Sequence, residues 1–158
     1  MDEQQFQRLY EATAGAIHAY LLGLTGMRDV ADDVLQETYL RYFLHHPDEM
    51  QGDEPRRYLF RIATNLVRDR WRARQDAQWP ETYDEGFLYD ANTSLEVRQV
   101  MKALKPRERE LLWLAYVEGM NHAEIALTLG LSPSSIRPLL FRARGKAAKL
   151  LRPEQEMA

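Results

Sequence analysis

Two segments of this chain concentrate arginine side chains, whose chemistry is the binding of phosphates and base edges. Between Arg56 and Arg74, seven arginines accompany a single acidic residue, Asp69. Between Arg137 and Lys149 there are five basic residues and no acidic residue. Arginine forms paired hydrogen bonds with guanine in the major groove or binds phosphate oxygens. The two segments are therefore candidate nucleic-acid-binding surfaces, with two solvated helix faces as the alternative.

The sequence offers little that could perform bond chemistry. It contains no cysteine, which excludes disulfides, thiolate metal sites and a cysteine nucleophile. Of the four histidines, His45 and His46 are adjacent, but no further ligands at helical spacing complete a metal site around them. No phosphate-binding glycine motif and no nucleophile–base pattern occurs. We therefore expect a protein that is not an enzyme and has no metal and no cofactor.

The window His122–Leu140 has the pattern of a helix-turn-helix. Ala126 is small enough for two helices to touch, Gly130 tolerates the positive φ of a tight turn, and Ile136 can close the contact from the second helix. An ordinary helical hairpin is the alternative. The second helix would expose polar and basic side chains that can reach DNA: Ser134, Ser135, Arg137, Arg142 and Arg144.

Helices must position these side chains, because apolar residues recur at spacings of three and four along most of the chain. The predicted helices cover residues 6–24, 29–42, 56–74, 94–104, 106–119, 121–130 and 132 onward. Asp29 can cap the second helix, with Asp32 in its first turn. Pro106 suits a first helical turn, and Asn121 with Glu124 forms a capping-box pattern. No segment predicts a strand.

The segment Trp79–Ser94 interrupts the helical pattern. It contains Pro80, Gly86 and four acidic residues, and it is long for a loop within a compact domain, at roughly 15 residues. We therefore expect an all-α chain of two small helical domains. The first covers residues 1–76, a flexible acidic linker covers 77–94, and a second domain with the helix-turn-helix covers 95–158.

Composition bounds the class of protein further. The net charge of −3 is an average over two basic segments and one acidic segment, so it does not argue strongly against a nucleic-acid partner. The N-terminus lacks the basic and apolar regions of a secretion signal, and no apolar run approaches the roughly 20 residues that cross a bilayer. We expect a cytoplasmic protein without membrane insertion.

Most of the chain resembles bacterial sigma factors of the extracytoplasmic-function group. Leu104–Leu151 resembles region four of that family, and Asp29–Phe43 followed by Arg56–Arg72 resembles region two. The resemblance implies a specificity subunit that binds core RNA polymerase, places it on promoters and opens the −10 element. It also implies that the free chain is a monomer and that an anti-sigma factor is a partner.

The resemblance assigns roles to residues on three predicted helices. The second helix matches the segment that docks on the polymerase clamp, through Asp32, Leu35, Gln36 and Glu37. The third helix matches the reader of the −10 element, where a base is flipped into a pocket, through Arg57, Arg61, Asn65, Arg68 and Arg72. The last helix matches the reader of the −35 element, through Ser134, Ser135, Arg137, Phe141, Arg142 and Arg144.

The chain departs from the family pattern in two places. The loop His45–Pro55 lacks the aromatic residue that the family usually has before the helix, and the family's usual tryptophan near position 58 is absent, with Tyr58 at that place. Pro138 and Leu139 replace polar or basic residues. Because proline inside a helix removes a hydrogen bond and costs about 3 kcal/mol, we expect either a helix that begins near Ser135 or a kink, with weakened −35 recognition.

Two other functions remain open from the sequence. A sigma-like chain could bind a regulator or core polymerase as a decoy without directing transcription. A helix-turn-helix repressor would leave the N-terminal half unexplained and would normally be a symmetric dimer, which gel filtration distinguishes from a monomer.

Overall fold

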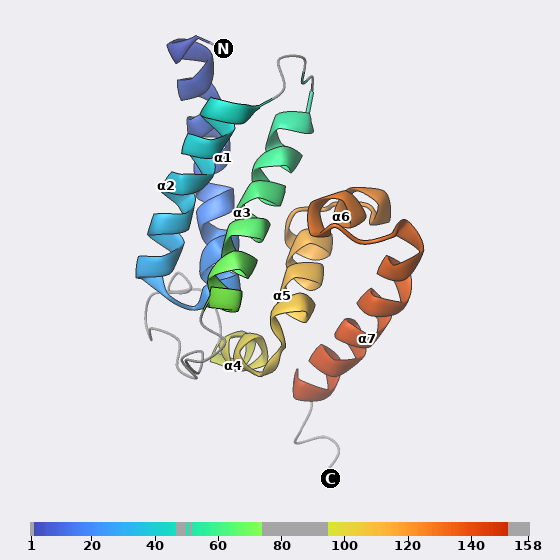
Figure 1. Ribbon diagram of the computed structural model, residues 1–158. Helices are drawn as coiled ribbons and strands as arrows, with labels where there is room; N and C mark the ends of the chain where they lie inside the picture. Colours follow the sequence, from blue (N-terminus) through green and yellow to red (C-terminus); the bar gives the residue numbers. More distant parts are fainter. Residues whose placement is uncertain (1, 47–49, 51, 74–94, 152–158) are drawn as a thin grey trace. The chain divides into compact units, whose positions relative to one another are not determined.

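The structure is a computed structural model that describes residues 2–46, 50, 52–73 and 95–151. Every regular element in these ranges is helical, which confirms the all-α prediction. The chain divides into two compact units, Met1–Pro80 and Glu81–Ala158 (Figure 1). The predicted domain limits at 76 and 95 stay a prediction, because residues 74–94 lie outside the described ranges. No described helix is long and apolar enough to cross a membrane.

The first unit is a bundle of three helices, α1 (Glu3–Thr25), α2 (Arg28–His45) and α3 (Glu54–Ala73), each of which contacts the other two (Figure 1). Reciprocal hydrogen bonds start α1: the Gln5 backbone N–H donates to the Asp2 carboxylate at 2.7 Å, and the Asp2 N–H donates to the Gln5 side chain at 3.1 Å. Gly26, with φ 67°, ends the helix in the left-handed region.

The start of α2 differs from the prediction. Met27 is the N-cap residue, so the predicted cap at Asp29 is wrong and Asp29 lies inside the first turn. Asp32 lies beyond that turn. The reason is the link from α1, where the Thr25 hydroxyl donates to the Leu21 carbonyl at 2.7 Å and accepts from the Met27 N–H at 3.2 Å. This short connection lets α2 begin at Arg28, two residues after Gly26. The Asp29 carboxylate in the first turn still interacts favourably with the positive end of the helix dipole.

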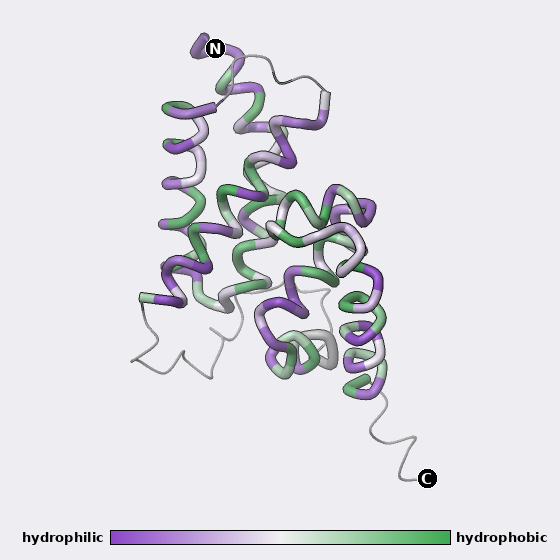
Figure 2. The backbone as a smooth tube through the Cα atoms, turned by 45° about the vertical axis from the view of Figure 1, so that its right-hand side comes forward, coloured by the Kyte–Doolittle hydropathy of each residue, from purple (hydrophilic) through white to green (hydrophobic). Residues whose placement is uncertain are grey.

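The core of the first unit consists of apolar side chains from all three helices. The fully buried ones include Ile17, Leu21, Leu59 and Phe60, each worth about 1.5–3 kcal/mol relative to exposure. Two hydrogen-bonded pairs of hydroxyls cross this core, Tyr20 with Thr64 at 2.7 Å and Tyr39 with Thr13. Burial raises the pKa of Tyr39 to about 12. Hydrophobic and hydrophilic positions alternate along these helices, as amphipathic packing requires (Figure 2).

The second unit contains α4 (Leu95–Ala103), α5 (Pro106–Leu112), the π-helical turn η1 (Trp113–Val117), α6 (His122–Leu129) and α7 (Pro133–Leu151). Pro106 is the first residue of α5, as predicted. The helix predicted to continue to Gly119 is wrong in its second half, where η1 replaces the α-helix. Leu111, Leu114, Ile125, Leu129 and Ile136 form the buried centre of this unit.

A buried arginine secures the end of α4. Arg109 is only 7% exposed, and its Nε donates to the Met101 carbonyl at 2.7 Å while Nη2 donates to the Lys102 carbonyl at 3.3 Å. Carbonyls in the last turn of a helix lack partners within the helix. The Arg109 guanidinium, which comes from α5, donates hydrogen bonds to two carbonyls near the end of α4, and its positive charge interacts favourably with the negative end of that helix's dipole.

Candidate nucleic-acid interface and partner-binding face

The turn between α6 and α7 has the geometry of a helix-turn-helix. Gly130 has φ 69° and ψ 37°, and its N–H donates to the Ala126 carbonyl, which also accepts from the Leu131 N–H at 2.9 Å. Ala126 is 3% exposed and Ile136 is fully buried. The three residues predicted for the small contact, the positive-φ turn and the closing contact are confirmed in those roles.

Hydrogen bonds at both helix starts fix this motif. The Glu124 N–H donates to the Asn121 side chain at 2.8 Å, and the Asn121 N–H donates to the Glu124 carboxylate at 3.1 Å, which confirms the predicted capping box. At the start of α7, the Ser135 hydroxyl donates to the Ser132 carbonyl at 2.7 Å. Helix α7 begins at Pro133, directly after Ser132.

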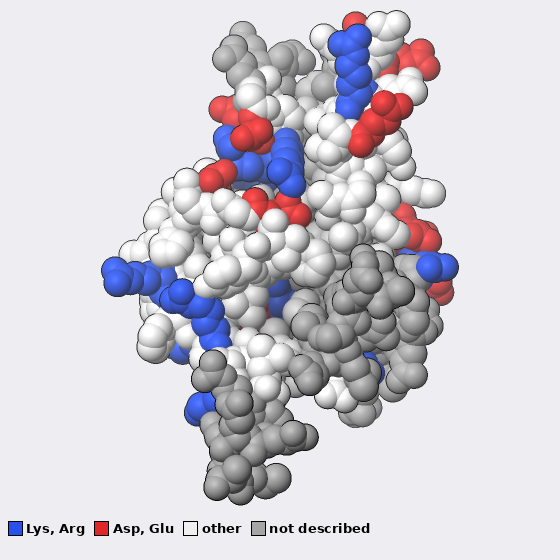
Figure 3. Space-filling view, turned by 180° about the vertical axis from the view of Figure 1, so that it is seen from behind, with Lys and Arg blue, Asp and Glu red and all other residues white. Residues whose placement is uncertain are grey.

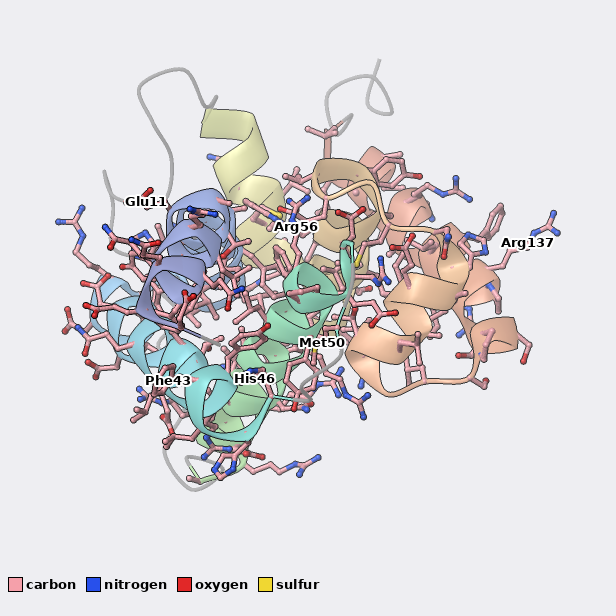
Figure 4. All side chains as sticks on the ribbon, turned by 90° about the horizontal axis from the view of Figure 1, so that it is seen from above. Glu11, Phe43, His46, Met50, Arg56 and Arg137 are labelled. Carbon is pink, nitrogen blue, oxygen red and sulfur yellow. The ribbon has the colours of Figure 1, made fainter. Side chains whose placement is uncertain are left out.

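The predicted −35 residues all lie outside the buried side of α7, which holds Ile136, Leu140 and Ala143. At about 100° per residue, Ser134, Arg137, Phe141 and Arg144 fall within about 80° of arc, and Ser135 and Arg142 lie on the adjoining flank. Ser135 is half-buried and the other five are exposed, Phe141 by 72%. Figure 4 shows Arg137 extending away from the ribbon, and Figure 3 shows basic side chains on the surface of α7.

Pro138 lies inside α7, five residues after its first residue, and it is exposed. The expectation of a helix beginning near Ser135 is wrong, because Pro133 occupies the first helical position, where its missing N–H costs nothing. Pro138 removes the N–H that the Ser134 carbonyl would accept in a regular α-helix. A kink at this point stays a prediction. Leu139 is half-buried, and its effect on DNA binding is likewise untested.

Two polar contacts connect α7 to the preceding helices. The Lys146 ammonium lies 2.9 Å from the Glu108 carboxylate of α5, which also accepts from the Lys105 N–H at 2.7 Å. Partial burial is the largest single influence on the pKa of Glu108 and acts to raise it. The hydrogen bonds from Lys105 and Lys146 and the charges of these two lysines together outweigh burial, so the pKa lies below its ordinary value. The second contact joins α7 to η1, where the Arg144 guanidinium donates to the Tyr116 hydroxyl at 3.1 Å.

The five predicted −10 residues form one stripe on α3. Their successive spacings of four, four, three and four place Arg57, Arg61, Asn65, Arg68 and Arg72 within about 80° of arc. The stripe faces away from the buried side of the helix, which holds Leu59, Ala63 and Val67. Arg61, Asn65 and Arg72 are exposed, and Arg57 and Arg68 are half-buried. The structure therefore brings these residues together, as the sequence predicted for an α-helix.

Other residues near this stripe serve packing. The Arg56 guanidinium lies over the Phe60 ring at 5.7 Å. His46 stacks on Tyr42 with ring centroids 4.8 Å apart, and its Nδ1 lies 2.7 Å from the Tyr42 carbonyl oxygen. Among the described residues, no group of three or more possible ligands could hold a metal ion. Residues 47–49 and 51 of the loop that precedes α3 lie outside the described ranges.

The predicted polymerase-docking residues occupy two adjacent parts of α2. Asp32, Leu35 and Gln36 share one face, and the Asp32 carboxylate lies 2.7 Å from His18 Nε2 of α1. Glu37 lies on the flank toward α3, with its carboxylate 3.1 Å from Arg41 and 4.0 Å from Arg70. The structure therefore groups three of the four residues and sets Glu37 beside them.

The same exposed face of α2 becomes apolar toward its C-terminal end. Leu40, Phe43 and Leu44 are 57%, 48% and 60% exposed. A groove of about 480 Å³ lies between this end of α2 and the start of α1, lined by Glu3, Phe6, Tyr39, Leu40 and Phe43. Sequence reasoning missed this feature, although these leucines and the phenylalanine fall off the buried stripe of the helix.

Comparison with known proteins identifies the family of both units. Residues 9–77 match the family model for sigma-70 region 2, and residues 94–146 match the model for sigma-70 region 4. RNA polymerase sigma factor NccH of Alcaligenes xylosoxydans xylosoxydans is 31% identical over 139 residues, covering 78% of this chain and 74% of NccH. The chain belongs to the sigma-70 family of RNA polymerase sigma factors.

Further relatives narrow the group within that family. The extracytoplasmic-function sigma factor SigE of Mycolicibacterium smegmatis is 29% identical over 156 residues, which cover 88% of this chain and 58% of SigE. The chain therefore spans about three-fifths of the length of this relative. The fold is shared with sigma factor RpoE of Bartonella quintana, solved with the anti-sigma factor NepR (TM-score 0.77, 23% identity, 96% of this chain and 99% of RpoE). Our chain is a member of the extracytoplasmic-function group.

Proposed function

We propose that this chain directs core RNA polymerase to promoters and opens them, by reading the −35 element with α7 and the −10 element with α3. The observation that carries the proposal is that both matched regions retain an exposed basic face on the helix that would meet DNA. A decoy that only binds polymerase or a regulator would not require both faces. In this function the chain recognises promoter DNA and catalyses no reaction itself. It acts in the cytoplasm.

On the −35 side, α7 enters the major groove, which admits one α-helix. Arg137 lies in the first half of the helix, where helix-turn-helix proteins contact base edges. Arg142 and Arg144, further along, are suited to phosphates. Phe141 presents an apolar surface to a thymine methyl group.

On the −10 side, the α3 stripe holds a separated strand. From Arg57 to Arg72 the helix rises about 22 Å, at about 1.5 Å per residue. Each strand of a duplex carries one phosphate per about 3.4 Å of helix axis, so a stripe of about 22 Å is long enough to contact several phosphates. Base flipping costs a few kcal/mol of stacking, which Asn65 at a base edge and the surrounding arginines would offset.

The face of α2 binds the polymerase core. Asp32 and Gln36 offer acceptors for a basic partner, and the exposed Leu40 and Phe43 add apolar area on the same helix. Large apolar side chains exposed together on a monomer are typical of a protein interface. Sigma factor RpoE of Bartonella quintana was solved with an anti-sigma factor. An anti-sigma factor would inhibit this chain by covering the exposed face of α2, and the free chain would be a monomer.

Transcription on fragmented genomic DNA tests the proposal. Core polymerase is incubated with and without the chain, and the 5′ ends of the RNA are sequenced. We expect new start sites that share two upstream motifs. Retained binding to core polymerase without new starts, while the same core is active with another sigma factor, would establish the decoy function instead.

A further inference from the structure

Tyr116 forms a hydrogen-bonded pair with Arg144. The sequence predicted a DNA-binding role for Arg144 but not for Tyr116. Tyr116 belongs to the π-helical turn η1, whose wider winding is marked by the hydrogen bond from the Glu118 N–H to the Trp113 carbonyl, at 3.1 Å. The Tyr116 side chain is 59% exposed, and its hydroxyl accepts a hydrogen bond from Arg144 Nη1 at 3.1 Å. Single π-helical turns occur frequently at functional sites.

This hydrogen bond leaves donors available on both partners. The Tyr116 hydroxyl oxygen is the acceptor in this hydrogen bond. The hydroxyl hydrogen of Tyr116 has no acceptor among the described residues and remains available to donate. A guanidinium carries five N–H donors, and within the described part of the chain Arg144 has no carboxylate partner. Because a hydrogen bond from a cation polarises the hydroxyl that accepts it, Tyr116 becomes a better donor to a further group. Two adjacent donors with a positive charge and no acid are suited to an anion.

The position of Arg144 on α7 indicates which kind of anion the pair would bind. Arg137, Phe141 and Arg144 follow one another at spacings of four and three, so they share one stripe of the helix. Arg144 lies about 10 Å along the axis from Arg137. The major groove is about 12 Å wide, so a helix that places Arg137 at the bases brings Arg144 to the wall of the groove, where the phosphates lie.

We propose that Tyr116 and Arg144 form a phosphate clamp that binds one backbone phosphate beside the −35 element. Arg144 supplies the charge, and Tyr116 both fixes the orientation of the guanidinium and donates a second hydrogen bond to the phosphate. The clamp rests on the proposed function of α7 as a DNA-reading helix. It makes Tyr116 a DNA-binding residue outside the helix-turn-helix.

Binding of this chain to DNA tests the clamp without knowledge of the promoter, because a phosphate contact does not depend on sequence. Fluorescence anisotropy measures the affinity for a random pool of 30-base-pair duplexes between about 50 and 200 mM salt. The variants are Tyr116→Phe, Arg144→Ala and the double variant. Tyr10→Phe on α1 is the matched control, since it also removes one exposed tyrosine hydroxyl. Arg142→Ala removes an arginine from the opposite flank of α7.

We expect Tyr116→Phe to weaken binding about fivefold, the equivalent of one hydrogen bond, while Tyr10→Phe has no effect. Arg144→Ala should reduce the slope of log affinity against log salt by about 0.9, as loss of one phosphate contact requires. In the Arg144→Ala background, Tyr116→Phe should change affinity less than twofold, but in the Arg142→Ala background the fivefold effect should remain.

Additive effects of Tyr116→Phe and Arg144→Ala, or full affinity in Tyr116→Phe, would overturn the clamp and leave the proposed function intact. Failure of the unsubstituted chain to bind any duplex at low salt would contradict DNA reading by α7 and the clamp with it. Equal thermal midpoints of all variants by circular dichroism ensure that the affinities compare folded proteins.

Discussion

Replacement of Pro138 by serine should stabilise the second unit. Pro138 lies in the second turn of α7, where a residue with an N–H would donate to the Ser134 carbonyl. The gain has a lower limit of about 1 kcal/mol, for one net hydrogen bond. Its upper limit is the cost of proline within a helix, about 3 kcal/mol relative to alanine, which is smaller for serine because serine is a weaker helix former. We therefore expect about 1–2 kcal/mol for Pro138→Ser.

Hydrogen exchange measures this gain in the unit concerned. Backbone amides of α7 should become about 5- to 30-fold more protected in Pro138→Ser, the equivalent of about 1–2 kcal/mol. Amides in the core of α1 should be unchanged, because they belong to the other unit.

Pro133→Ser provides the matched control. It also removes a proline from α7, but from the first helical position, where no hydrogen bond is missing, so its effect should stay within about 0.5 kcal/mol. Unchanged or lower protection in Pro138→Ser would show that α7 accommodates the proline without loss, and the reasoning about the Ser134 carbonyl would be refuted.

Three further predictions concern the same unit. Pro138→Ser should also raise the affinity for a −35 duplex in a gel-shift titration, and unchanged binding would remove Pro138 as the cause of weak −35 recognition. Gly130→Ala should lower the free energy of unfolding, measured by urea denaturation, by about 1–2 kcal/mol. The cost would come from the positive φ alone, because a Cβ added at Gly130 meets no atom within 4 Å. A loss above about 3 kcal/mol would contradict this reasoning. Because the pKa of Glu108 is lowered below its ordinary 4.5, its contribution to stability is present above that value and is lost as the pH falls through the lowered pKa. Glu108→Gln should therefore be less stable than the unsubstituted chain at neutral pH, with the difference vanishing in acid, and a difference independent of pH would refute the electrostatic origin.

Local requirements made part of this protein predictable from its sequence. A tight turn between two touching helices needs a small residue, a residue that tolerates positive φ and a branched apolar residue, and Ala126, Gly130 and Ile136 satisfy these needs at fixed offsets. The α3 stripe was predictable for the same reason, because residues at spacings of three and four share a face of any α-helix.

Features that depend on packing between helices were not predictable. Arg109 looks like one more surface cation in the sequence, and only the position of α4 shows that it satisfies carbonyls at the end of that helix. Tyr116 lies in the π-helical turn η1, where its hydroxyl accepts a hydrogen bond from Arg144, and no sequence signal marked that turn. The start of α2 was misplaced because the Thr25 side chain, rather than Asp29, organises the connection.

Opening of the −10 element tests the central claim most directly. At a start site obtained with this chain, permanganate would be used to detect unpaired thymines in complexes of core polymerase with the unsubstituted chain or with a variant carrying Arg61→Ala, Asn65→Ala and Arg72→Ala. All three residues are exposed on the α3 stripe, so the variant should fold. We predict reactive thymines around the −10 element with the unsubstituted chain and a large loss of reactivity with the variant, at equal binding to core polymerase. Equal reactivity in both complexes would contradict the role of α3, and no reactivity in either would contradict promoter opening by this chain.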